Sequence, residues 1–141
     1  MEINYTKRYF NMYLDANFFV IATIAEDEKG VRARAIANEI IKGKLAITSS
    51  LTIDEVMWVL LKKQFKHDIR PIVEEIYGMK NLEIKEVPAG IPLRALDFME
   101  KHDLKPRDAF HLAIMEHFGV KEIVSDDADF DDIPGIKRIK I

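Results

Sequence analysis

The sequence predicts an α/β protein, a doubly wound α/β/α sandwich on a parallel sheet of about five strands. Short apolar runs alternate with longer segments whose apolar residues recur at helical spacing. This alternation favours a parallel sheet covered by helices on both faces. With 141 residues, 48% hydrophobic and 32% charged, the chain is expected to be a single domain over residues 1–141 with one core.

Five short segments are expected to form the strands. Several are bounded by turn residues, such as Gly43 before the second and Gly119 before the fourth. The third alternates apolar and charged residues, as a half-exposed edge strand does. The expected strands are residues 10–14, 45–48, 82–87, 122–124 and 137–141.

Five longer segments between the strands are expected to be helices. Pro71 suits the first turn of one of them, and Gly119 ends the last. The expected helices are residues 28–42, 52–65, 67–79, 91–103 and 105–118. In an open parallel sheet, ligands bind at the carboxyl ends of the strands, near the point where the strand order reverses. Functional residues should therefore follow the strands directly.

Composition excludes several classes of protein. The net charge is −3, with 24 acidic against 21 basic side chains, so a polyanion would have to meet a local basic patch or bound cations. The absence of cysteine excludes disulfides, zinc–thiolate sites and cysteine nucleophiles, and it fits a reducing compartment. No apolar run approaches the ~18 residues of a membrane span, and the start MEINYTKRYFN does not resemble a secretion signal. We expect a cytoplasmic protein without a membrane partner.

Carboxylates from four separate segments converge on one edge of the predicted sheet. Asp15 follows the first strand, Glu55 lies early in the helix after the second, and Asp108 lies in the first turn of the helix before the fourth. Asp127 lies in the run IVSDDADFDD, behind the fourth strand. Such a concentration of negative charge requires compensation, and divalent cations with oxygen ligands usually provide it.

Each of these acids also has a purely structural explanation. Asp15 could cap a helix, and Asp108 would favour a helix N-terminus whatever its function. The segment TIDE, residues 52–55, matches a capping box in which Thr52 and Glu55 bond each other's amides. The aspartate run could be a solvated turn. Taken singly these interpretations stay open, but together the four acids favour a metal site.

Other chemistries find less support. Three aspartates of the run match the opening of a calcium-binding EF-hand, but Asp132 stands where the loop needs glycine and Arg138 where it needs glutamate. The chain has no glycine-rich phosphate loop, no nucleophile elbow and no zinc-like histidine spacing. We expect His111 to play a structural or supporting role, and Met57 and Trp58 to pack in the core or at a subunit interface.

Four segments resemble the PIN-domain family, and especially its toxin branch, the VapC-type ribonucleases. They are YLDANFF (13–19), SSLTIDEVMWVL (49–60), LKPRDAFHLAIMEHFGV (104–120) and IVSDDADFDDIPGIKRI (123–139). The resemblance covers nearly the whole chain in the right order and implies a PIN-like fold. It places the acidic residues of the family on Asp15, Glu55, Asp108 and Asp127.

The same resemblance implies residues that support the site, and this chain departs from the family pattern in two places. Asn17 and Ser125 match small polar positions of the family, and Asp126 stands at a position of varied composition, as a possible further metal ligand. The first acid of the family usually lies within a few residues of the start. Here it is Asp15, so residues 1–9 are expected to be an N-terminal extension.

The activity implied by the resemblance is that of a Mg²⁺- or Mn²⁺-dependent endoribonuclease, which leaves a 5′-phosphate and a 3′-hydroxyl. Asp15, Asp108 and Asp127 would hold one ion, and Glu55 would bridge or serve a second. Arg107 is a candidate for contacting an RNA phosphate. The toxin branch further implies a homodimer and an antitoxin partner whose tail enters the acidic groove.

Three alternatives remain open on the sequence. The chain could be a PIN-domain nuclease of RNA processing without an antitoxin, or a catalytically silent PIN scaffold. It could also be a receiver-like phosphoacceptor domain. That domain needs an acidic pair after the first strand and an acceptor aspartate after the third, where this chain has a single acid and VPAG (87–90).

Overall fold

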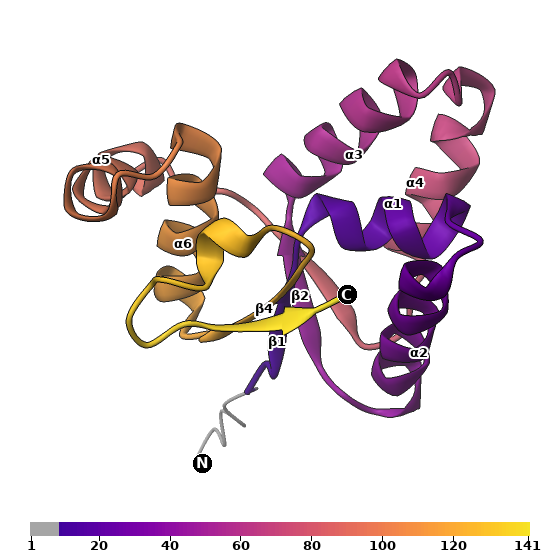
Figure 1. Ribbon diagram of the computed structural model, residues 1–141, viewed down its shortest axis with the longest axis horizontal. Coiled ribbons are helices and arrows are strands. Elements are labelled where there is room, and N and C mark those ends of the chain that lie inside the picture. The colour runs from indigo at the N-terminus through magenta and orange to yellow at the C-terminus, as the bar shows by residue number, and fades with distance from the viewer. Residues whose placement is uncertain (1–8) are drawn as a thin grey trace, which may run out of the picture.

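A computed structural model describes residues 9–141, which form one sheet of five strands in the order β3-β2-β1-β4-β5 (Figure 1). All four neighbouring pairs are parallel, so the predicted doubly wound sheet is confirmed. Residues 1–8 of the expected N-terminal extension lie outside the described residues. The strands are β1 (Met12–Leu14), β2 (Ala46–Ser49), β3 (Leu82–Lys85), β4 (Glu122–Ser125) and β5 (Lys137–Lys140).

The five predicted helices are present, with ends that differ by a few residues. They are α2 (Glu28–Lys42), α3 (Ser50–Lys62), α4 (Ile69–Tyr77), α5 (Ile91–His102) and α6 (Pro106–Phe118), with short 3₁₀ turns η1 (Lys66–Asp68) and η2 (Ala128–Phe130). A further helix, α1 (Ala16–Ile24), was not predicted. Its sequence ANFFVIATI carries a single polar side chain near each end and lacks the polar face that marks a surface helix.

The sheet separates two hydrophobic clusters, as in the predicted three-layer sandwich. Met12 and Leu14 of β1 face the cluster built with α1 to α4, and Tyr13 between them faces the cluster built with α5 and α6. Figure 1 shows α1 to α4 on the right of the strands and α5 and α6 on the left. Phe130, just beyond the aspartate run, is fully buried and anchors the run to the second cluster.

The chain leaves the central strand β1 in both directions, to β2 and β3 on one side and to β4 and β5 on the other. The carboxyl ends of β1 and β4 therefore meet at the point where the order reverses, which is where a doubly wound sheet binds its ligand. This order differs from the 2-1-3-4-5 order of receiver-like domains. The receiver alternative is wrong for this chain.

The ends of α6 are fixed by backbone chemistry. Pro106 occupies the first helical position, where its missing N–H costs no hydrogen bond. Gly119 ends the helix with φ 72°, a left-handed conformation that glycine adopts without a steric penalty. Together they fix where α6 begins and ends. This helix places Asp108 and His111 at the binding edge of the sheet.

Two side chains expected in the core or at a subunit interface lie on the outer face of α3. Met57 is 39% and Trp58 is 52% exposed, so the core part of that expectation is wrong. No helix within residues 9–141 is both long and apolar enough to cross a membrane.

Candidate metal centre

Asp15 occupies the junction between β1 and α1, at the centre of the sheet edge. Its Oδ1 accepts a hydrogen bond from the amide of Ala16 at 2.8 Å, which caps α1. Its Oδ2 accepts from the hydroxyl of Ser125 at 2.7 Å, and the side chain is 9% exposed. Asp15 is thus both a helix cap and a nearly buried carboxylate aimed at the binding edge, so the two interpretations of the sequence are compatible.

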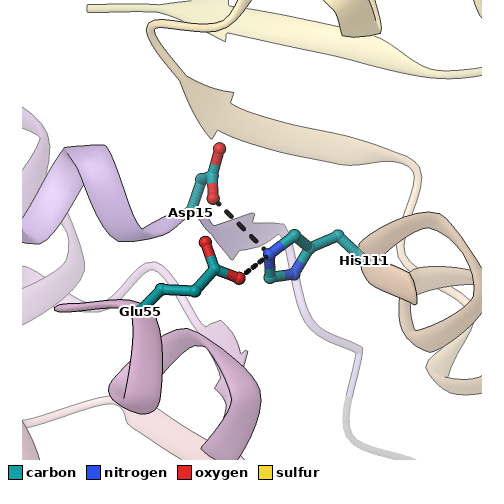
Figure 2. Close-up of side chains that lie close together, drawn as sticks. All are labelled: Asp15, Glu55 and His111. Carbon is teal, nitrogen blue, oxygen red and sulfur yellow. Dashed lines mark hydrogen bonds and ion pairs between the residues drawn. The ribbon is translucent and has the colours of Figure 1, made fainter. Parts of the chain in front are cut away.

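Glu55 projects from α3 toward the same place, and its predicted capping box does not form. The N-cap of α3 is Ser49, whose side chain accepts from the amide of Thr52 at 3.4 Å. Glu55 lies in the second turn, where its Oε1 is 2.6 Å from Nε2 of His111. Figure 2 shows the carboxylates of Asp15 and Glu55 converging on the ring of His111.

His111 is enclosed at the centre of this group, with its side chain 1% exposed. Its Nε2 is also 3.7 Å from Oδ1 of Asp15, and its Nδ1 is 2.6 Å from the hydroxyl of Tyr13. Burial opposes a charged ring, but the hydrogen bond to Glu55 and the nearby carboxylates outweigh it and hold the pKa of His111 above its ordinary value.

Asp108 and Asp127 form a second acidic group, on α6 and at the start of η2. Burial, then the charges of Asp127 and Asp15, raise the pKa of the Asp108 carboxyl to about 6. Asp129 is exposed, but its carboxylate comes within 4.8 Å of those of Asp108 and Asp127. Because Asp15 and His111 both act on Asp108 electrostatically, the two groups adjoin.

Ser125 and Asn17 tie the two groups together. The hydroxyl of the buried Ser125 donates to Asp15 and accepts from the amide of Asp127 at 3.0 Å. The amide nitrogen of Asn17 lies 3.2 Å from the hydroxyl of Ser125 and 3.4 Å from Oδ2 of Asp15. Asn17 Oδ1 accepts from the backbone of Asp126 at 3.0 Å. These contacts fix the chain on both sides of the site.

The remaining aspartates of the run contact basic residues or solvent outside the two acidic groups. Asp126 turns away from both groups to bind Lys29 of α2 at 2.8 Å. Asp131 is exposed and binds Arg138 at 2.6 Å, while Asp132 is exposed. The structure therefore separates Asp127, which faces the site, from the adjacent Asp126, which holds α2 to the loop.

Two sets of three side chains could each hold a metal ion, since their ligand atoms lie within 4.8 Å of one another: Asp15, Glu55 and His111, and Asp108, Asp127 and Asp129. Five of the six donors are carboxylates, the oxygen ligands that Mg²⁺ and Mn²⁺ prefer. Burial is the main cause of the raised pKa of Asp108, and the charges of Asp127 and Asp15 add a repulsion that a cation would relieve. The residues present therefore fit a divalent metal ion.

The family model of the PIN domain matches residues 12–136, from the first strand to the last loop. The chain belongs to the PIN-domain family. The matched span includes every acidic residue of both groups and the helices that carry them.

Known proteins similar to this chain include two that are named as VapC ribonucleases. Ribonuclease VapC13 of Mycobacterium tuberculosis is 26% identical over 107 residues, which cover 75% of this chain and 81% of that protein. The VapC ribonuclease Mb1869c of Mycobacterium bovis matches with the same identity and coverage.

Solved structures share the PIN fold. VapC20 of Mycobacterium tuberculosis, described as a sarcin-ricin-loop-cleaving toxin, superposes with a TM-score of 0.71 at 21% identity, covering 86% of this chain and 93% of that chain. The VapBC2 complex of Rickettsia felis, bound to a DNA fragment from its promoter, gives a TM-score of 0.73 at 15% identity, covering 93% and 98%.

Tyr13 is the part of this PIN-domain site that the sequence did not reveal. It is fully buried, and its hydroxyl contacts Ser49 at 2.9 Å, Thr52 at 3.2 Å and His111 at 2.6 Å. Burial raises the pKa of that hydroxyl, so it stays protonated. Its position two residues before Asp15 is a usable signal, because residues i and i+2 of a strand face the same side of the sheet.

Proposed function

We propose that this PIN domain is a Mg²⁺- or Mn²⁺-dependent endoribonuclease that hydrolyses RNA phosphodiester bonds, and that it is the toxin of a type II toxin–antitoxin pair. The observation that carries the proposal is the pair of adjoining acidic groups at the carboxyl edge of the sheet. The names of the VapC ribonuclease relatives support the activity. The VapBC complexes among the structural neighbours support an antitoxin partner.

Asp15, Asp108 and Asp127 are assigned to the principal cation, and Glu55 to a bridging position or to a second ion. A divalent cation held by these residues would activate water and would stabilise the charge of the leaving oxygen. Ser125 and Asn17 orient Asp15 through its Oδ2, at 2.7 and 3.4 Å. Each of these six residues then has either a ligand role or the role of fixing a ligand.

Arg107 is assigned to the RNA backbone. Its Nε lies 3.6 Å from Oε1 of Glu55, and its side chain is 55% exposed. Because more than half of the side chain is exposed and its contact with Glu55 is long, the guanidinium is free to turn to the phosphate of a substrate. The contact places a positive charge beside an acidic centre that would otherwise repel RNA.

The partners are RNA, an antitoxin protein and a second copy of the chain in a homodimer. An RNA target and an antitoxin made beside the toxin would both be met in the cytoplasm, so a cytoplasmic location belongs to the proposal. The exposed Met57 and Trp58 on α3 remain available for a subunit interface, which was the second half of the sequence-based expectation.

The activity is tested with purified protein and end-labelled single-stranded RNA in Mg²⁺, in Mn²⁺ and in excess chelator. Asp127→Asn should lower the cleavage rate at least about 100-fold, because it removes a ligand charge. Asp126→Asn makes the same change at the adjacent residue and should stay within about threefold of the wild type, since Asp126 binds Lys29. Products should carry a 5′-phosphate and a 3′-hydroxyl.

Equal cleavage by wild type and Asp127→Asn, or cleavage that survives the chelator, would overturn the assignment of the metal ligands. If the wild type binds the metal in a calorimetric titration but cleaves no RNA in either metal, the silent-scaffold alternative replaces the nuclease. Co-expression with the product of a neighbouring gene, followed by copurification, tests the antitoxin and separates the toxin from a nuclease of RNA processing.

A further inference from the structure

A shallow cavity of about 410 Å³ lies between the first turns of α3 and α6, lined by Leu51, Lys105, Pro106, Arg107 and Phe110. We propose that this cavity receives one unpaired base of a single-stranded RNA, next to the phosphate that is cleaved. The inference rests on the proposed ribonuclease function and narrows its substrate to RNA with an exposed base at the cut.

The apolar part of the cavity is firmly held. Leu51 and Phe110 are half-buried and pack against the cluster between the sheet, α5 and α6, so their outer faces are presented in fixed positions. Pro106 adds a rigid ring at the start of α6. An apolar surface with one aromatic face suits a nucleobase, because every base can stack on an aromatic ring whatever its sequence.

The polar part of the cavity is positive. Other cations near the acidic groups are already engaged, since Lys29 binds Asp126 at 2.8 Å and Arg138 binds Asp131 at 2.6 Å. Lys105 is exposed, and no acidic partner lies within 4.0 Å of it among residues 9–141. Lys105 is therefore a cation free to meet a phosphate on this side of the site, and Arg107, whose side chain is 55% exposed, pairs with Glu55 at 3.6 Å.

Arg107 connects the cavity to the metal centre. It lines the cavity, and its Nε lies 3.6 Å from the carboxylate of Glu55. A nucleotide whose base occupies the cavity would hold its phosphate near Arg107 and the acidic edge. This adjacency points to a base beside the scissile bond rather than to one several nucleotides away.

Two other cavities fit this role less well. A cavity of about 500 Å³ between α1, α2 and α4 shares no lining residue with the acidic groups. A smaller one of about 220 Å³ is lined in part by Asp103, Asp129 and Asp132, whose charges would repel a phosphate. Of these three, the cavity at Phe110 alone is lined by apolar and cationic side chains with no acidic residue, and it adjoins the acidic site through Arg107.

Double-stranded RNA cannot use such a cavity, because its bases are stacked and paired inside the helix. Recognition of single bases by aromatic side chains is a property of unpaired loops and ends. The proposal therefore predicts a preference for single strands as well as a dependence on one particular base position.

The test begins by mapping the position at which the wild type cuts a labelled single-stranded RNA of mixed sequence. The nucleotide on each side of the cut is then replaced, one at a time, by an abasic residue that keeps the backbone. We expect kcat/KM to fall about tenfold at one of the two positions, from the loss of one base–aromatic stack. Annealing a complementary strand over the cut should reduce cleavage at least as much.

Phe110→Leu keeps an apolar side chain but removes the aromatic face. It should lower kcat/KM on the intact RNA about tenfold and should show no further loss on the abasic RNA. Phe98→Leu is the matched control, because Phe98 is half-buried against the same cluster but lies outside the cavity. For Phe98→Leu, kcat/KM should fall from the intact to the abasic RNA by as much as it does for the wild type. Melting temperatures of both variants verify that they fold.

The cationic part is tested by the salt dependence of KM. Lys105→Gln should raise KM for all single strands alike and reduce the slope of log KM against log salt by about one. Lys62→Gln, at the exposed far end of α3, should leave that slope unchanged.

Equal cleavage of intact and abasic RNA at both positions would overturn the base cavity and leave the ribonuclease function standing. If the wild type cleaves no RNA, the proposed function fails, and the cavity is then judged by binding of the same RNAs in Ca²⁺. Weaker binding by Phe110→Leu and not by Phe98→Leu would support the cavity. Equal binding by both variants would overturn it.

Discussion

Nε2 of His111 lies 2.6 Å from Oε1 of Glu55 and joins α6 to α3 across 56 residues of sequence. An ionised carboxylate can only accept, so the hydrogen of this contact belongs to Nε2. On the other side of the ring, Nδ1 faces the hydroxyl of Tyr13 at 2.6 Å. The buried chain Tyr13–His111–Glu55 thus fixes the orientation of one carboxylate at the proposed metal centre.

Removing the imidazole should loosen Glu55 and weaken the metal site. We expect His111→Ala to lower Mn²⁺ affinity or the cleavage rate about 10- to 100-fold, as the loss of a residue that orients a ligand does. Calorimetric titration with Mn²⁺ measures the affinity. His117→Ala, on the exposed end of the same helix, is the control. Unchanged Mn²⁺ affinity in a folded His111→Ala would show that Glu55 needs no such support.

The hydroxyl of Tyr13 should contribute to stability more than to chemistry. Tyr13→Phe leaves His111 Nδ1 without its partner inside the core and should lower the free energy of unfolding by about 1–3 kcal/mol. Urea titration measures the change. Tyr77→Phe makes the same substitution at a side chain that is 60% exposed and should change little. Equal stability of Tyr13→Phe and wild type would contradict the buried hydrogen bond.

Asp108 should make the metal-free protein less stable as pH rises. Its folded pKa of about 6 lies above the ordinary 3.8, so the folded state holds the proton more tightly than the unfolded state. Stability is therefore lost between about pH 4 and 6, and the loss is complete above that range. Because the side chain is half-exposed, solvent screening reduces the effect to about 1 kcal/mol.

Asp108→Asn removes this titration, so the variant should gain stability over the wild type at pH 8 and not at pH 4. Urea titrations in excess chelator at both pH values measure the difference. Mg²⁺ should stabilise the wild type more than the variant at pH 8, because the cation relieves the same repulsion. A difference between the two proteins that is the same at both pH values would refute the assignment to Asp108.

The hydroxyl of Ser125 aligns Asp15 and Asp127, so its removal should reduce activity without removing a charge. We expect Ser125→Ala to lower the cleavage rate about tenfold, within the range for residues that orient metal ligands. Ser125→Thr keeps the hydroxyl and should fall between Ala and wild type. Full activity of Ser125→Ala would show that the hydroxyl is dispensable.

The fold could be predicted from the sequence except for α1. The central strands are short apolar runs bounded by turn residues, β3 alternates apolar and charged residues, and the five other helices carry apolar residues at helical spacing. Residues 16–24 lie against the sheet, α2 and α3, and only Asn17 and Thr23 among them are polar. A helix enclosed on most sides leaves no periodic trace from which to predict it.

At the site, the sequence placed the acids but not their partners. A capping rule cannot choose between Ser49 and Thr52, since both are good N-caps. In the structure Ser49 caps the helix, and the hydroxyl of Tyr13 contacts both side chains from 36 and 39 residues away. Glu55 meets His111, which is 56 residues away, and contacts of such long range leave no mark in the local sequence.

The hydrogen bond between Ser125 and Asp15 spans 110 residues, and β1 gains its second neighbour only when β4 is in place. During synthesis, a chain that has reached Asp108 already carries three of the four proposed acids, yet it has no strand to close the edge on which they meet. Contacts of such long range form late in folding. Cleavage activity would thus appear only when the whole domain has been made, and an unfinished chain would be harmless to RNA.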